Sequence, residues 1–235
     1  MTFDLDESTT AFAQEIQDLL LAVLPAPDGD YEQLRITVIR QEDWRSIRPG
    51  TAEKPVRIPL LHNGAHVANL GIYYRCVPDQ SRSYLAVRRS QFEVHSLQEG
   101  TPLLRFDYAY DAHSVPAAHW NVHAERGATS VLLTRCNPKH QGLLSKVHLP
   151  VGGTRYRPCL EDFLEMLIVE FNIDTRPGWK KAVQAGRERW RTYQTKAIVR
   201  DSPAVAADVL RQLGYRVEEP SDGEPQPKVG MLHGR

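Results

Sequence analysis

The residues best suited to chemistry are an arginine, an aspartate and two histidines in the middle of the chain. Arg105 and Asp107 are two residues apart, and His119 and His123 follow in the next segment. Imidazole titrates near neutral pH, and a neighbouring carboxylate can orient it for general acid–base catalysis. A nuclease that works without a metal ion needs such a set, so these four are the candidate catalytic residues.

Whether these side chains share a surface depends on the element that carries residues 117–125. As a strand, this segment turns Trp120 and Val122 to one face and the two histidines to the other. Positions four residues apart on a strand are about 13 Å apart at ~3.3 Å per residue, which is too far for one metal ion. On a helix the histidines would share one face, as zinc-binding histidines do, although no Glu follows His119 directly.

The alternation favours the strand, since Trp and Val suit a sheet, and the helix stays open as the alternative. We expect no metal and no cofactor there. The simpler alternative to catalysis is a solvated sheet face on which His119 and His123 make ordinary hydrogen bonds.

A second group of candidates is basic. Gly152 and Gly153 form a turn that leads into a predicted helix, whose free N–H groups and dipole favour anions. The predicted helix 179–200 is also rich in basic residues. The alternatives are a purely structural turn and a solvated outer helix face. The sequence predicts anion binding by Arg155, Arg157, Lys180, Arg187 and Arg191.

Cys159 stands at a predicted helix start, where the pKa of a thiol can fall. The run His148-Leu149-Pro150 with the later Cys159-Leu160 weakly resembles the His-Pro and Cys-Leu steps of ubiquitin-conjugating enzymes, but Leu149 separates His from Pro and the family's Asn is missing. A reactive thiol and a buried, inert cysteine both stay open. Three cysteines without a CxxC pair argue against a disulfide framework or a cysteine zinc site.

The elements that must position these residues follow from hydrophobic periodicity. Apolar residues recur every three to four positions up to Leu24, which predicts an N-terminal helix capped by Asp6 or Ser8. Between residues 34 and 125 the period changes to two, and Asn63-Gly64 is a hairpin signal. We therefore expect an antiparallel sheet in this part of the chain.

Helical periodicity returns after residue 158, and it predicts three C-terminal helices over 160–171, 179–199 and 203–213. The fold class is therefore α+β, in a single domain of residues 1–218. Residues 219–235 are rich in Pro, Gly and charge, which predicts a disordered tail. The predicted core includes Phe106, Trp120, Leu164, Leu167, Trp179 and Trp190.

Charge is balanced overall but uneven along the chain. Basic and acidic residues each number 29, so the formal net charge is zero, which excludes a generic polycation. Residues 1–34 carry eight acidic and no basic side chains, whereas residues 177–200 carry seven basic and one acidic. This asymmetry favours either an acidic or nucleic-acid partner or an attraction between the two segments within the molecule.

The chain shows no signal peptide, and no apolar run approaches the ~20 residues of a membrane span. We therefore expect a cytoplasmic protein without membrane contact. The expected partners are nucleic acid or a protein encoded nearby.

Several of these segments together resemble a set of uncharacterised actinobacterial proteins of similar length. The resemblance covers residues 30–217 and rests on 104–108, His119 with His123, 147–153 and 157–165. Some of those proteins occur beside helix-turn-helix and metallopeptidase regulators in defence-type loci. A weaker resemblance, to the TumE-like toxin family, rests on the Asp and His strands followed by an amphipathic helix. The resemblance implies a toxin–antitoxin or phage-defence component that contacts or cleaves RNA, or else a non-catalytic interaction module of such a system.

Overall fold

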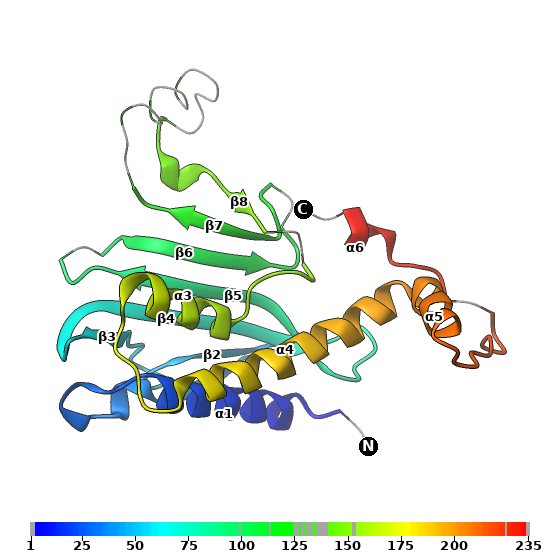
Figure 1. Cartoon of the computed structure of the whole chain (residues 1–235), viewed down its shortest axis with the longest axis horizontal. Coiled ribbons are helices and arrows are strands. Elements are labelled where there is room, and N and C mark those ends of the chain that lie inside the picture. Colours follow the sequence, from blue (N-terminus) through cyan, green and yellow to red (C-terminus); the bar gives the residue numbers. More distant parts are fainter. Residues whose placement is uncertain are drawn as a thin grey trace.

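The computed structural model describes residues 3–98, 100–112, 114–124, 127, 130, 134, 141–151, 154–223 and 225–233. Its main elements are an antiparallel sheet and helices that flank it in the sequence (Figure 1). The helices are α1 (Leu5–Val23), α3 (Leu160–Phe171), α4 (Trp179–Asp201), α5 (Pro203–Gln212) and α6 (Val229–His233). The strands are β1 (Ile36–Arg40), β2 (Arg45–Pro49), β3 (Ile58–His62), β4 (Ala65–Pro78), β5 (Leu85–His95), β6 (Pro102–Ala109), β7 (Ala118–Val122) and β8 (Leu149–Pro150).

The strands pair in the order β1-β2-β4-β5-β6-β7-β8, with β3 paired to β4, and every pairing is antiparallel. This confirms the predicted α+β class, the antiparallel sheet, the N-terminal helix and the three C-terminal helices α3, α4 and α5. The sheet reaches beyond residue 125, because β8 joins it from the segment before α3. Asn63 and Gly64 form the tight β3–β4 turn, both with positive φ.

Helix α1 begins two to four residues earlier than the sequence suggested, because Asp4 rather than Asp6 or Ser8 is its cap. The Asp4 carboxylate accepts a hydrogen bond from the Glu7 amide at 2.9 Å. Asp6 lies in the first helical turn and binds the guanidinium of Arg45 on β2. The apolar face of α1 is buried, and the helix ends where Pro25 follows Leu24.

The core lies between the sheet and the helices α1, α3 and α4. Phe163 of α3 stacks on Trp120 of β7, with ring centroids 5.5 Å apart, and meets Phe92 of β5 edge-on at 5.5 Å. Phe106 of β6 contacts both Phe92 and Trp120. Three residues of the predicted core are buried: Phe106, Leu164 and Leu167. The other three are half-buried: Trp120, Trp179 and Trp190.

Helices α3 and α4 approach each other closely where the Glu161 side chain lies against Gly186. A Cβ atom at position 186 would fall 2.1 Å from the Glu161 Oε1 atom, so only glycine fits there without displacing the carboxyl group. Glu161 is itself buried, and burial raises the pKa of its carboxyl group.

The C-terminal segment lies beside the end of α4. The Lys228 amide donates to the Asp201 carbonyl at 2.8 Å, and the Lys228 ammonium lies 3.6 Å from the Asp201 carboxylate. The short helix α6 follows in the part of the chain for which the sequence predicted disorder. Among the described residues, no helix is long and apolar enough to cross a membrane.

Candidate functional site

The position of His119 on strand β7 determines which face of the sheet carries its side chain. Residues 118–122 are a strand, and they pair with β6 so that Asp107 lies opposite His119 and Phe106 opposite Trp120. Neighbouring side chains on a strand point to opposite faces. Phe106 and Trp120 therefore face the helices, whereas Asp107 and His119 lie on the other face of the sheet, which we call the open face.

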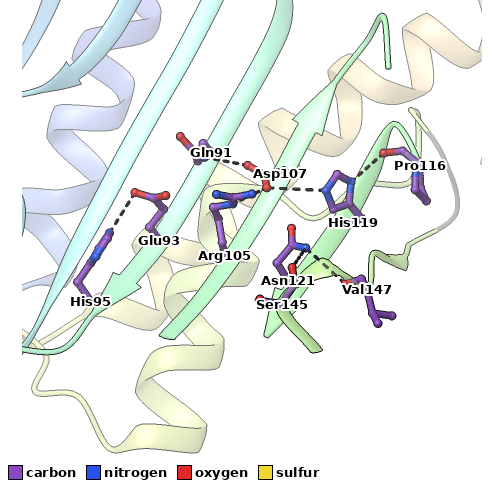
Figure 2. A network of polar contacts seen from close by, with 10 residues as sticks. All are labelled: Gln91, Glu93, His95, Arg105, Asp107, Pro116, His119, Asn121, Ser145 and Val147. Atoms are coloured by element: carbon purple, nitrogen blue, oxygen red, sulfur yellow. Dashed lines mark hydrogen bonds and ion pairs between the residues drawn. The ribbon is translucent and has the colours of Figure 1, made fainter. Parts of the chain in front are cut away.

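Asp107 is the centre of a polar network on the open face (Figure 2). Arg105 Nε donates to Asp107 Oδ2 at 2.6 Å, and Gln91 Nε2, from β5, donates to Asp107 Oδ1 at 3.0 Å. Both carboxylate oxygens are thus bound by donors, one of them charged. Because the guanidinium of Arg105 compensates its charge, Asp107 is an ion-paired carboxylate rather than a free base.

His119 completes the network from the neighbouring strand. Its Nε2 atom lies 3.8 Å from Asp107 Oδ2, and its Nδ1 atom lies 2.8 Å from the Pro116 carbonyl oxygen. A carbonyl only accepts, so Nδ1 carries the proton and donates. The ring is 4% exposed and meets the His148 ring edge-on at 4.5 Å. Both nitrogens of His119 therefore face protein atoms rather than a substrate space.

His123 and Asn121 have different places in the structure. Asn121 is buried and its Nδ2 donates to the Ser145 carbonyl at 3.0 Å, which ties the segment before β8 to β7. His123 lies one residue past the end of β7, and its amide donates to the Leu103 carbonyl at 2.9 Å. The structure thus brings Arg105, Asp107 and His119 together, whereas His123 lies beyond the strand end.

A second acid–imidazole pair lies on the same face and was not among the predicted residues. His95 Nε2 is 3.1 Å from Glu93 Oε2, and His95 Nδ1 is 3.1 Å from the Gly100 carbonyl oxygen. Both ring nitrogens face acceptors, so the imidazolium form can donate at both. The signal in the sequence was the alternation Gln91-Phe92-Glu93, which sends the polar residues of β5 to the open face.

The open face also carries an arginine cluster, which comprises Arg48, Arg75 and Arg89 from β2, β4 and β5. Arg75 and Arg89 are direct cross-strand partners in the register, an arrangement that repels unless a counter-charge is present. The Arg75 guanidinium lies 4.6 Å from the Trp44 ring centroid. Burial raises the pKa of Tyr73, while the positive charges of Arg75, Arg89 and Arg48 act to lower it, so all three lie near this phenol.

Carboxylates are scarce around this cluster. Arg89 lies 4.0 Å from Asp111, and both side chains are more than half exposed, so this pair is weak. Arg48 donates to the Ala52 carbonyl at 2.7 Å. In the described part of the chain, neither Arg48 nor Arg75 forms an ion pair with a carboxylate.

The five basic residues predicted to bind anions lie away from this cluster, in the segment before α3 and on α4. Arg155 pairs with Asp201 at 2.7 Å, and Arg187 pairs with Asp162 at 2.7 Å. Arg191 lies 3.7 Å from Asp162. Lys180 is exposed beside Trp179, whereas Arg157 is buried.

The charge asymmetry of the chain is partly matched within the molecule. Arg189 of α4 lies 3.8 Å from Glu15 of α1, so the basic helix and the acidic N-terminal helix face each other at this point. Gly152 and Gly153 lie outside the described residues, so their predicted role in anion binding stays a prediction.

Cys159 has the environment of an inert thiol. It is buried at the start of α3, and its Sγ lies 3.1 Å from Asp162 Oδ2. Burial, together with the Glu161 and Asp162 carboxylates, raises the pKa of this thiol. These effects outweigh the helix terminus, and they favour the buried alternative over a cysteine-dependent transfer reaction.

No group of three or more His, Cys, Asp or Glu residues that could hold a metal ion is present among the residues described. An ion-paired network on β5–β7 lies on the same face of the sheet as the arginine cluster on β2–β5. No protein-family model, no curated protein and no solved structure matches this chain.

Proposed function

We propose that the protein binds single-stranded RNA on the open face of its sheet, with the arginine cluster as the phosphate-binding part. The observation that carries this proposal is the direct register pairing of Arg75 with Arg89, to which Arg48 adds a third positive charge. Like charges in this position destabilise a sheet unless an anion lies between them. A phosphate backbone supplies that anion, and guanidinium groups bind phosphate with high geometric specificity.

Two aromatic side chains favour a single strand over a duplex. Trp44 lies under the Arg75 guanidinium, and Tyr73, two residues before Arg75 on β4, lies on the same face of the sheet. Unpaired bases stack on aromatic rings or guanidinium planes, whereas a duplex keeps its bases stacked inside. The sheet therefore offers both partners that single-stranded RNA uses, positive charge for the backbone and flat surfaces for the bases.

The test is the salt dependence of binding to a short fluorescent RNA, measured by anisotropy. The double variant Arg75→Gln/Arg89→Gln should weaken binding roughly tenfold or more and reduce the slope of log K against log salt by about 1.4, as expected for two lost phosphate contacts. The matched control is Arg211→Gln/Arg216→Gln, which removes two exposed arginines elsewhere. If both double variants lose the same amount of affinity, the binding depends only on the total charge of the protein, and the proposal is overturned.

Binding is favoured over cleavage by the state of the acid–base pair. His119 is buried with its Nδ1 proton on the Pro116 carbonyl, and Asp107 is paired with Arg105. RNA cleavage by Arg105, Asp107, His119 and His123 stays a prediction of the sequence. Its test is single-turnover cleavage of the bound RNA. A binding-only protein leaves the RNA intact, and Asp107→Asn binds it slightly tighter because a negative charge is lost.

The role in toxin–antitoxin or phage-defence systems likewise stays a prediction, drawn from the resemblance stated above. Growth arrest on expression, relieved by the product of a neighbouring gene, is the result that would support it. A protein that neither arrests growth nor binds RNA would instead favour the non-catalytic interaction module. The surface to examine first would then be α5 with the residue that follows it, where Val205, Val209 and Leu213 are exposed at a spacing of four residues.

A further inference from the structure

A cavity of about 550 Å³ lies between α1, α4 and the helix-covered face of the sheet. This is on the opposite side of β4, β5 and β6 from the open face. The volume falls in the range of sites that hold small organic molecules. Its walls are rich in aromatic side chains, which include Phe12, Tyr74, Phe92, Tyr108, Trp190 and Tyr193.

Arg157 lines this cavity and is an unusual group to find there. Its side chain is 6% exposed, and its guanidinium lies between two rings, 3.7 Å from the Tyr108 centroid and 4.8 Å from the Trp190 centroid. One nitrogen donates to the Thr154 carbonyl, but the buried Nε has no hydrogen-bond partner among the described residues. A buried charge without a counter-ion is costly, so the site favours an anion.

Several other charged groups around the cavity have charged partners, and one carboxyl group is buried. Arg155 is paired with Asp201, and Arg189 with Glu15. Glu161 also lines the cavity, and burial raises the pKa of its carboxyl group. The mouth adds positive charge through Lys196 and Arg200. Arg88, Lys196 and Arg200 also line the cavity without a carboxylate partner among the described residues, but they are half-buried or exposed, so Arg157 is the buried cation that lacks one.

We propose that this cavity binds a small aromatic carboxylate, whose single negative charge is matched by Arg157 and whose rings pack against Tyr74, Phe92 and Trp190. A carboxylate suits a guanidinium because both groups are planar and can share two hydrogen bonds. A single charge suits the site because Arg157 is the one buried cation without a carboxylate partner in the described lining, and the acidic side chain of Glu161 lies in the same lining. The aromatic body is favoured because rings prefer edge-on and stacked contacts with other rings.

The test uses 2-naphthoate and its uncharged analogue 2-naphthamide as probes, titrated into the full chain by calorimetry. The wild-type protein should bind 2-naphthoate at one site, roughly tenfold or more tighter than the amide. Arg157→Met should remove this preference and leave the binding of the amide unchanged. The control is Arg211→Met, an exposed arginine on α5 that does not line the cavity, and it should behave as wild type.

Three outcomes would overturn the proposal: no saturable binding of 2-naphthoate up to about 5 mM, equal affinities for acid and amide, or an equal loss in Arg211→Met. If Arg157→Met does not fold by circular dichroism, the wild-type preference for the acid still decides. Arg157→Lys then serves as the second variant, because it keeps the charge but loses the planar fork, and it should weaken 2-naphthoate selectively. The result is independent of RNA binding, which uses the other face.

Discussion

On the helix-covered side of β5, β6 and β7, the side chains of Phe92, Phe106 and Trp120 form a continuous row of ring contacts. On the open side, the residues between them, Gln91, Asp107 and His119, form a chain of polar contacts instead. The first row is held by excluding water, and it is indifferent to charge. The second is held by matching each charge, and it can respond to a ligand that brings charge of its own.

The comparison extends to the arginines on the two sides. Arg157, on the covered side, is sandwiched by rings, whereas Arg75 and Arg89, on the open side, face each other in the register. In both places a guanidinium lies without a carboxylate partner among the described residues, yet the surroundings select different anions. An enclosed aromatic space favours one small ligand, and an open row of cations favours an extended polyanion.

The largest difference between the faces should appear in stability. Phe106→Ala removes a fully buried ring, and it should lower the free energy of unfolding by about 3–5 kcal/mol in urea denaturation. Gln91→Ala, from the open face, removes a hydrogen bond to Asp107 and should cost about 0.5–1.5 kcal/mol. Equal costs would show that the two faces are not held by different forces.

The two histidines of the candidate set provide a finer comparison within the open face. His119→Ala removes a buried ring that bonds to Pro116 and neighbours Asp107, so it should lower the free energy of unfolding by about 1–3 kcal/mol. His123→Ala, past the end of β7, truncates a half-buried side chain and should cost less than His119→Ala. The measurement is the urea midpoint of both variants at neutral pH, and a reversed order would contradict the placement of His119 in the network.

A further prediction concerns the stability of the protein at alkaline pH, which depends on two buried cysteines. Burial raises the pKa of Cys76 to about 12, and burial with the neighbouring carboxylates raises that of Cys159. Both thiols lose their protons more easily in the unfolded chain than in the folded protein. Their contribution to the free energy of unfolding is therefore complete below the pKa of the unfolded chain, and it is lost as pH rises toward the pKa of the folded protein. Above about pH 9, each should lower the free energy of unfolding by about 1.4 kcal/mol per pH unit.

The check is the urea midpoint between pH 8 and 10.5 for wild type and Cys76→Ala. The variant should show a shallower decline because one thiol no longer titrates. The same slope in both proteins would mean that Cys76 contributes nothing to the alkaline loss.

The alternation of apolar residues was enough to predict which face of β6 and β7 each side chain takes. Because residues 103–110 and 117–122 are neighbours along the chain, their pairing could also be anticipated, and Asp107 does lie opposite His119. Helix lengths followed from periodicity for the same reason: both are properties of short stretches of sequence.

The arginine cluster could not be found in this way, because it depends on the register between β4 and β5. That register shifts at Arg75/Cys76, and only the observed alignment sets Arg75 opposite Arg89. For the basic helix α4, the sequence instead suggested free cations, some of which the structure shows to be paired. Its Arg187 looks like a free cation in the sequence, but the packing of α4 on α3 brings Asp162 against it.

The close approach of Glu161 and Gly186 has a consequence for how the chain can change over generations. Because the carboxyl group occupies the space of a side chain at 186, the two positions behave as a single unit of variation. A library that randomises position 186 alone should return glycine, whereas one that also shortens residue 161 to alanine should admit alanine at 186. Substitution at position 186 should therefore be accepted more readily once residue 161 has been shortened.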